Sequence, residues 1–291
     1  MSPQSPEQNI APPKKEFFAR GEAFSHKCEG RPINQDAYFL YKDNQGIFDG
    51  VTGSLGEIAA QTASDVCKNK MGHLPTITTT KQETQQVYAG LRKILKIADK
   101  EVYKKSTKLP EPINATALIS HLFINHEGQL EDSIANSGDT RVYLLRGDNF
   151  VQLTIDDGVI KKENPNNVRE IQKKFSNVHY AKLELSQKEQ ELFRKRNLII
   201  SCVGDGKCKP TLYSMILKEG DILFFSTDGV HDNLTDNELE NAIKEGKSAQ
   251  EIVMMALERS RKQDKIETRK DLKGRAKNDD KTCMIVEITK A

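Results

Sequence analysis

Acidic residues stand at the ends of apolar, strand-like segments of this 291-residue chain, with small or polar neighbours beside them. The segment QGIFDGVTG carries an apolar pair to Asp49 and follows it with Gly50. The segment ILFFSTDG repeats the arrangement with Asp228 and a second glycine. A single aspartate at the end of a strand is ordinarily a turn residue. The repetition is what makes these positions candidates for chemistry.

Three further segments show the same device. Asp36 stands directly before an apolar strand, Asp139 lies in a turn between two strands, and Asp279 precedes the last strand. Clustered carboxylates repel one another and raise each other's pKa values, and a bound cation relieves the repulsion. Mg²⁺ and Mn²⁺ prefer oxygen ligands. Two such ions about 3.5–4 Å apart share and acidify a water molecule. The sequence thus suits a divalent metal site, provided that the fold brings these residues together.

Local sequence patterns predict the helices and strands that position these residues. Capping boxes, Ser/Thr-x-x-Glu, indicate helix starts at Ser54, Thr80, Ser186, Thr235 and Ser248. The strongest amphipathic helix follows Thr80 and extends to about residue 105, and helices also occupy the 236–263 block. Strands are predicted at 37–41, 46–48, 116–124, 131–136, 141–146, 150–153, 181–185, 197–201, 221–226 and 283–288.

Strands in hairpin order, with helices gathered in separate blocks, predict an α+β fold with antiparallel sheets. Two such sheets can pack face to face with helices outside. The Pro-, Gln- and Ser-rich N-terminus predicts a disordered tail over residues 1–18. No linker divides the remainder, so we expect one catalytic domain over residues 19–291.

The bulk composition excludes several classes of protein. Lys+Arg 44 against Asp+Glu 42 leaves a net charge of +2, which argues against nucleic acid as a partner. No apolar run is long enough for a membrane span. The five cysteines lack CxxC spacing, so we expect reduced thiols. The N-terminus has no apolar secretory region, so we expect a cytoplasmic protein. The short and compact form of the chain predicts a monomer. Signal-less export as a host-directed factor stays open.

The acidic segments resemble, in order, the motifs of the metal-dependent Ser/Thr protein phosphatases of type 2C (PPM-type, in a compact bacterial-like form). RPINQDA resembles Arg-x-x-Asn-Glu-Asp-Ala of that family, and GIFDGVTG resembles Phe-Asp-Gly-His-Gly-Gly. NSGDTRVYLLRGD resembles Gly-Asp-Ser-Arg-x-Tyr, and NDDKTCMIV resembles Asp-Asn-x-Thr-x-Ile-Val. Together with NATALI, QLTIDD, RNLIISCVGD and FFSTDGVHDNLTDNEL, these motifs cover residues 31–288.

The resemblance implies a β-sandwich of two antiparallel sheets flanked by helices, in four layers ordered αββα. It implies two Mg²⁺ or Mn²⁺ ions at one end of the sandwich and a weaker third ion. A water or hydroxide bridging the two ions would attack the phosphorus of phosphoserine or phosphothreonine, with no phosphoenzyme. Arg31 would grip the phosphate, because a guanidinium fork matches phosphate oxygens. The implied metal residues are Asp49 as the bridging ligand, the Gly50 carbonyl, Asp36, Asp228 and Asp279, with Asp139 and Asp232 for the third ion.

Three positions depart from the family pattern. Val51 stands where many members carry a histidine, a proposed general acid for the leaving alcohol. Gln35 replaces a glutamate and removes one charge beside the site. Asp280 replaces an asparagine and adds a charge. The first two support an alternative, a pseudophosphatase that binds phosphoproteins or regulates a kinase. A phosphatase dedicated to one regulatory protein, or to a non-protein phosphate ester, is a third hypothesis.

Residues 156–197 correspond to the mobile flap of the family. The segment begins with the polar, proline-broken DDGVIKKENPNN and continues into the capped helix SQKEQELFRKR. Its basic residues either steer acidic phosphopeptides or form a solvated face. These residues are Lys161, Lys162, Lys173, Lys174, Arg194, Lys195 and Arg196.

Overall fold

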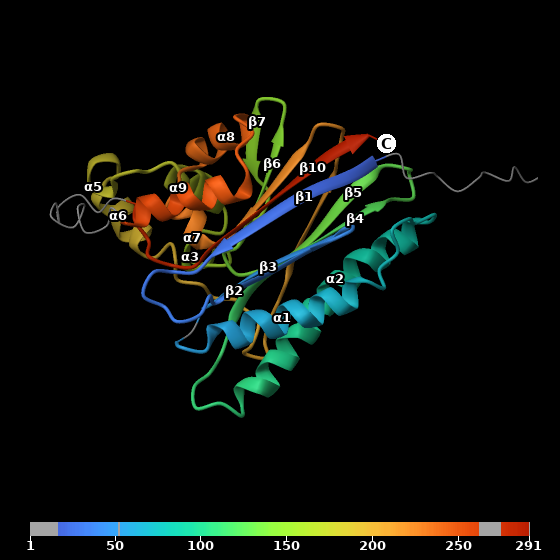
Figure 1. The fold of residues 1–291 in the computed structure, drawn as a ribbon, viewed down its shortest axis with the longest axis horizontal. Coiled ribbons are helices and arrows are strands. Elements are labelled where there is room, and N and C mark those ends of the chain that lie inside the picture. The colour runs from blue at the N-terminus through green and yellow to red at the C-terminus, as the bar shows by residue number, and fades with distance from the viewer. Residues whose placement is uncertain (1–16, 52, 262–274, 291) are drawn as a thin grey trace, which may run out of the picture.

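Two five-stranded antiparallel sheets pack face to face in the computed structural model, and helices cover both outer faces (Figure 1). The structure describes residues 17–51, 53–261 and 275–290. The predicted α+β sandwich with flanking helices is confirmed. Within the described ranges, no helix is both long and apolar enough to cross a membrane.

The first sheet has the strand order β1-β10-β9-β6-β7 and contains both ends of the described chain. The N-terminal strand lies antiparallel to the C-terminal one over their full lengths. Its strands are β1 (Phe17–His26), β10 (Lys281–Lys290), β9 (Ile222–Ser226), β6 (Arg141–Arg146) and β7 (Asn149–Gln152).

The second sheet has the order β2-β3-β4-β5-β8. Hairpins join β2 to β3 and β4 to β5, whereas two helices lie between β3 and β4 in the chain. The three central strands, β3, β4 and β5, are buried along their whole lengths. Burial on both faces is expected for a middle layer that packs against the other sheet and against helices. The strands are β2 (Asp36–Tyr41), β3 (Asn44–Gly50), β4 (Ala115–Ile124), β5 (Leu130–Ser137) and β8 (Thr211–Ile216).

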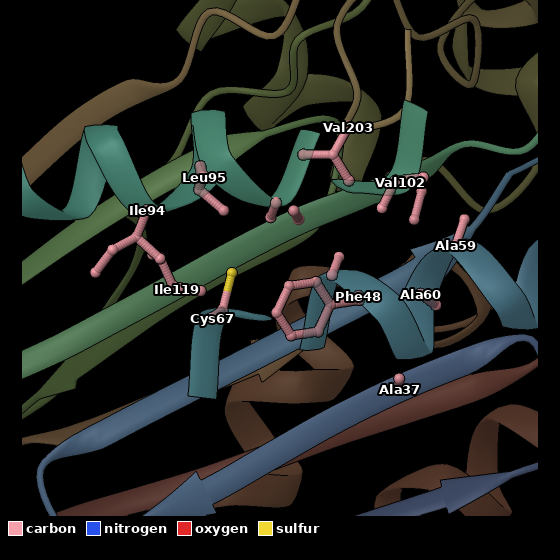
Figure 2. Close-up of a cluster of buried hydrophobic side chains, with 14 of the residues drawn as sticks. Ala37, Phe48, Ala59, Ala60, Cys67, Ile94, Leu95, Val102, Ile119 and Val203 are labelled. Atoms are coloured by element: carbon pink, nitrogen blue, oxygen red, sulfur yellow. The ribbon is translucent and has the colours of Figure 1, made fainter. Parts of the chain in front are cut away.

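Helices α1 (Gly56–Met71) and α2 (Lys81–Ser106) cover the outer face of the second sheet. Figure 2 shows how small residues on α1 let the helix approach Phe48 of β3. Leu95 of α2 packs into the same cluster. On the other side, α7 (Asp228–His231), α8 (Asp236–Lys244) and α9 (Ala249–Arg261) pack over the first sheet.

Four short helices follow β7 and form a unit of their own at one end of the sandwich (Figure 1). They are α3 (Val159–Glu163), α4 (Val168–Ser176), α5 (Ala181–Glu184) and α6 (Gln187–Arg194). Phe175 and Phe193 pack edge to face in a small apolar cluster of this unit. The segment predicted as a flap therefore has its own core.

Three sequence predictions of local structure are wrong. Ala181–Glu184 of the predicted strand 181–185 form helix α5, because Ala181 and the following Leu185 pack into the apolar cluster of the four-helix unit at helical spacing. Residues 197–201 contain only a single bridge between Gly158 and Ile199. Ser54 does not cap α1, since its amide and hydroxyl bind Glu111 instead.

Other predicted helix caps are confirmed, and the structure contains two strands that the sequence did not predict. Reciprocal capping bonds form at Thr80, Ser186 and Thr235 as expected. Ser248 and Glu251 exchange the same pair of bonds. Strands β1 and β8 were not predicted, and Phe17 and Phe18 of the expected tail belong to β1. The rest of that tail lies outside the described residues.

Candidate metal centre

Both sheets deliver carboxylates to the same end of the sandwich. Asp49 is the second-to-last residue of β3 and lies directly opposite Asp36 at the start of β2. Asp228 follows β9, and Asp279 precedes β10, the neighbour of β9 in the first sheet. The fold therefore brings these four aspartates together, which the sequence alone could not establish.

Threonine hydroxyls join the two sheets at this point. Thr227 Oγ1 donates to Asp36 Oδ2 over 3.0 Å, and Thr282 Oγ1 donates to the same oxygen over 2.6 Å. Asp36 belongs to the second sheet, whereas Thr227 directly follows β9 and Thr282 lies in β10 of the first sheet, so this carboxylate is fixed across the sandwich. Its other oxygen, Oδ1, is buried and has no hydrogen-bond partner among the described residues.

Glycine follows two of the aspartates because the backbone is crowded there. A Cβ on Gly50 would lie 2.5 Å from the backbone of Gly56, where β3 meets the start of α1. A Cβ on Gly229 would lie 1.8 Å from the carbonyl oxygen of Asp280. The Asp-Gly pairs therefore let β3, α1 and the segment before β10 approach one another closely at the acidic end.

Burial and the charges of neighbouring acids raise the pKa values of Asp36, Asp49 and Asp228. Burial raises the pKa of Asp49 well above its ordinary value, and the charges of Asp228, Asp36 and Asp279 raise it further. Burial together with nearby acids raises the pKa of Asp36 to about 8 despite its threonine donors. The pKa of Asp228 is also raised by burial, with Lys277 opposing the effect. Such a group of anions requires positive charge to be fully ionised.

The donor chemistry of the centre fits a divalent ion. Asp36 Oδ1 and Asp228 Oδ1 are buried and have no hydrogen-bond partner among the described residues. Carboxylate oxygens in an anionic cluster are the ligands that Mg²⁺ and Mn²⁺ take. In the part of the chain that the structure describes, however, no three His, Cys, Asp or Glu side chains already have the arrangement of a complete ligand set.

Two basic side chains hold the cluster in this arrangement. Lys277 Nζ forms ion pairs with Asp228 Oδ2 and, over 3.0 Å, with Asp279 Oδ2. Arg31 Nη1 contacts Asp279 Oδ1 at 2.7 Å and Asp280 Oδ2 at 2.6 Å. Lys277 was missed by the sequence analysis. It is two residues before a predicted ligand, which is the only signal that could have singled it out.

Asp280, one of the departures from the family pattern, organises the loop that carries Arg31. Its Oδ1 accepts from the Cys28 amide over 2.6 Å, and its Oδ2 accepts from the Gln35 amide over 3.0 Å. The Gln35 side chain in turn donates from Nε2 to the Gly53 carbonyl over 3.1 Å. A glutamate could not make that donation, so Gln35 ties the Arg31 loop to the turn after Asp49.

The two residues expected to hold a third ion have different surroundings. Burial and the charge of Asp228 raise the pKa of Asp139 well above its ordinary value. Asp232, although buried, has a lowered pKa because Arg196, Lys277 and other cations surround it. Asn197 Nδ2 donates to Asp232 Oδ2 over 2.5 Å, and Arg196 Nε lies 3.5 Å from Oδ1. Asp232 therefore already joins the four-helix unit to α7.

Most basic residues of the flap segment have acidic neighbours. Lys161 pairs with Asp157, Lys174 with Glu189, and Lys195 with Glu163. Arg196 pairs with Asp232, as described above. Since four of the seven named cations are compensated locally, they favour a solvated, ion-paired face over a steering patch for acidic peptides.

The chain resembles known phosphatases in sequence over most of its length. It is 24% identical over 226 residues to the serine/threonine phosphatase stp of Listeria monocytogenes, covering 76% of this chain and 81% of that protein. It is 26% identical over 232 residues to the mitochondrial protein phosphatase 2C homolog 7 of Saccharomyces cerevisiae, covering 74% of this chain and 57% of that protein. No family model matches the chain.

Solved structures show the same fold. The catalytic domain of the serine/threonine protein phosphatase PstP in complex with two manganese ions superposes with a TM-score of 0.69 at 19% identity, covering 94% of this chain and 99% of that one. Serine/threonine phosphatase Stp1 from Staphylococcus aureus gives a TM-score of 0.69 at 17% identity, with 99% of each chain covered.

Proposed function

We propose that the chain is a metal-dependent Ser/Thr protein phosphatase of type 2C and that it hydrolyses phosphoserine and phosphothreonine in proteins, as its likeness to known phosphatases supports. The observation that carries the proposal is the convergence of Asp36, Asp49, Asp228 and Asp279 from two sheets, with two buried carboxylate oxygens lacking a protein donor in the described ranges. Mutual repulsion among these acids is relieved by divalent cations, and their oxygens suit Mg²⁺ or Mn²⁺.

We assign each residue of the centre a part in metal binding. Asp49 has the charges of the other three acids around it, which supports a bridging position between two ions. The Gly50 carbonyl, Asp36, Asp228 and Asp279 would complete the ligand sets. When bound, a divalent pair there would neutralise phosphate charge and activate water for attack on phosphorus. Asp139 is kept as a candidate for a third ion, together with Asp232 once Arg196 and Asn197 move away.

Arg31 is proposed to bind the substrate phosphate. Its two ion pairs, to Asp279 and Asp280, are both made by Nη1 and hold the guanidinium beside the centre. The side chain is 34% exposed, so an incoming phosphate can reach it. The geometry thus supplies a fixed cation that orients the phosphate towards the acidic centre, and charge-assisted bonds of this kind are the stronger ones.

The remaining expectations concern the state of the protein in the cell. We propose that it acts as a monomer on phosphoproteins in the cytoplasm, without nucleic-acid or membrane partners. All five cysteines are free thiols, which supports a reducing compartment. The near balance of basic and acidic residues supports the absence of a nucleic-acid partner.

The test is hydrolysis of p-nitrophenyl phosphate and of a phosphothreonine peptide, each with Mn²⁺ and with EDTA. The wild type is expected to turn over both substrates with Mn²⁺ only, and Asp228→Asn to lose that turnover. Asp148→Asn is the matched control, because Asp148 is an exposed aspartate whose ion pair with Lys244 lies on the surface. Absence of turnover in a wild type that binds Mn²⁺ would refute the proposal and favour a phosphoprotein-binding module.

A further inference from the structure

We propose that Lys277 is a resident cation of the acidic centre and that divalent metal binds there in competition with its ammonium group. This inference rests on the proposed function, since it presupposes a metal centre at Asp49. It adds a property that the ligand positions alone do not imply: a metal ion that binds Asp228 and Asp279 must displace the Lys277 ammonium group.

The contacts divide the centre into a filled side and an open side. Both oxygens of Asp279 are taken by protein cations, Oδ1 by Arg31 and Oδ2 by Lys277. Lys277 also takes Oδ2 of Asp228. The Oδ1 atoms of Asp36 and Asp228, by contrast, are buried without a partner in the described structure. An ion that binds Asp228 Oδ1 would therefore share this carboxylate with the ammonium group of Lys277, which pairs with Oδ2.

Lys277 is positioned by its backbone, so its place in the centre is built into the fold. The buried Asn233 side chain donates from Nδ2 to the Lys277 carbonyl over 2.8 Å and accepts from the Lys277 amide over 2.8 Å. The same Nδ2 donates to the carbonyl of Gly229, the residue after Asp228. A single asparagine thus clamps the lysine segment to the segment that carries the ligand.

A second anchor lies two residues upstream. The buried Arg275 donates to the carbonyls of Val178 over 2.6 Å and His231 over 2.8 Å, and also to that of Phe175. These bonds tie the start of the lysine segment to the four-helix unit and to α7. With both sides of Lys277 fixed, its side chain, 26% exposed, is directed at the carboxylates.

Another lysine in the same segment shows that the contact is specific. Lys281 is also buried, but its Nζ donates to the backbone carbonyl of Asp279 over 2.7 Å. Among the lysines that the structure describes, only Lys277 places its ammonium between two of the proposed ligand side chains. A unit charge within ion-pair distance of a ligand carboxylate repels a divalent ion bound to the same oxygens. Removing that charge is therefore expected to tighten metal binding.

The experiment is calorimetric titration of Mn²⁺ into the full chain as wild type, Lys277→Met and Lys161→Met. Methionine keeps the unbranched stem and removes the charge. Lys161 is the matched control, because it is 30% exposed and pairs with Asp157 outside the centre. We expect Lys277→Met to bind Mn²⁺ at least about tenfold more tightly than the wild type. Lys161→Met is expected to match the wild type.

Thermal unfolding gives an independent readout. In EDTA, Lys277→Met is expected to melt below the wild type, because the acids have lost a counter-charge. With excess Mn²⁺ that gap is expected to close or reverse. If Lys277→Met is unfolded in EDTA, recovery of its fold on adding Mn²⁺ supports the proposal equally, and Lys277→Gln repeats the titration with a polar side chain.

The outcomes separate this inference from the proposed function. Equal Mn²⁺ affinity of the wild type and both Lys277 variants would overturn the competition and leave the metal centre standing. If only the Lys277 variants bind Mn²⁺, Lys277 excludes the metal from the wild type completely. That result would support the competition and would refute metal-dependent catalysis by the wild type. If neither the wild type nor the variants bind Mn²⁺, both the metal centre and the competition are wrong.

Discussion

The acidic centre and the Asp132 side chain on β5 both bury carboxyl groups, but with different neighbours. In the centre, burial and the charges of neighbouring aspartates from both sheets raise the pKa of Asp49. The hydrogen-bond neighbours of Asp132 are neutral: Ser120 Oγ donates to its Oδ1 over 2.5 Å and is also 3.1 Å from Gln45 Oε1. In the described structure, Glu131 is the one acidic residue that adds to its pKa shift. One oxygen of Asp132 also has no partner among the described residues.

The difference shows that an unpartnered buried carboxylate oxygen is not by itself a sign of function. For Asp132, burial raises the pKa to about 7, and a single proton is enough to remove the charge. Protonating every member of a facing group of acids is harder, because their titrations oppose one another and cations compete for the site. The clustering of the acids, together with Lys277 and Arg31 among them, is what sets the centre apart.

Asp99 on α2 marks the opposite extreme. It is buried, and its carboxylate accepts from the amides of Gly204 over 2.7 Å, Gly206 over 3.0 Å and Cys208 over 3.1 Å. Those donors satisfy the charge and pin the loop before β8 to the helix. A buried aspartate in this chain can thus be stabilised by amides, by a proton or by cations, and only the third arrangement suits catalysis.

The largest expected effect comes from removing one charge in each region. Asp49→Asn is expected to lower Mn²⁺-dependent turnover of a phosphothreonine peptide at least about 1,000-fold, because the proposed bridging ligand would be lost. Asp132→Asn is expected to keep wild-type turnover, because the residue lies in the interior of the sandwich away from the centre. Steady-state rates and Mn²⁺ titrations of both variants make the comparison, and similar losses in the two would break it.

The next effect is on stability, and it isolates Asp132. The pKa of Asp132 is raised from an ordinary value of 3.8 to about 7, with burial as the main cause and Glu131 adding to it. The folded protein therefore keeps a proton that the unfolded chain releases above about pH 4. Stability falls as the pH rises through this window, by about 1.4 kcal/mol per pH unit for one group, and levels off above about pH 7.

Asp132→Asn is expected to remove this share of the pH dependence. Urea unfolding of the wild type and the variant at pH 5 and pH 8, both in EDTA, measures it, since the acidic centre then contributes equally to the two proteins. The wild type should lose on the order of 2 kcal/mol more than the variant between the two pH values. Equal losses would show that Asp132 titrates normally, and the contrast with the centre would then rest on geometry alone.

The sequence indicated which aspartates lie at strand ends better than it indicated their surroundings. Asp36, Asp49, Asp228 and Asp279 were singled out because each follows or precedes an apolar strand, and the structure brings them to one end of the sandwich. Lys277 could not be found in this way, because its role depends on the Asn233 clamp, a contact between segments distant in sequence. The same holds for Asp280, whose partners Cys28 and Gln35 lie at the other end of the chain.

The missed elements have a similar cause. β1 has polar and small residues along a half-exposed edge strand, so its apolar alternation is weak, and full-length pairing with β10 makes it a strand. Residues 181–185 alternate like a strand, but the apolar cluster of the four-helix unit selects a helical turn. In both cases tertiary contacts decided between two local structures of similar propensity.

The smallest expected effect concerns Val51, which distinguishes this centre from relatives that carry a histidine there. Val51 is 39% exposed at the end of β3, and its amide donates to the Asn114 carbonyl over 3.0 Å, so a larger side chain can be added without disturbing the core. Val51→His introduces a candidate general acid beside the leaving group. We expect turnover of a phosphothreonine peptide to rise up to about tenfold, less than the full gain from a positioned acid.

The choice of substrate separates proton donation from other effects of the histidine. The p-nitrophenolate leaving group departs without a proton, whereas the threonine alkoxide needs one, so the gain should be confined to the peptide. Urea unfolding should give the same stability for the wild type and Val51→His. An equal gain on p-nitrophenyl phosphate would instead indicate that the histidine changes metal or phosphate binding. The gain would then come from altered charge around Asp49 and not from proton donation.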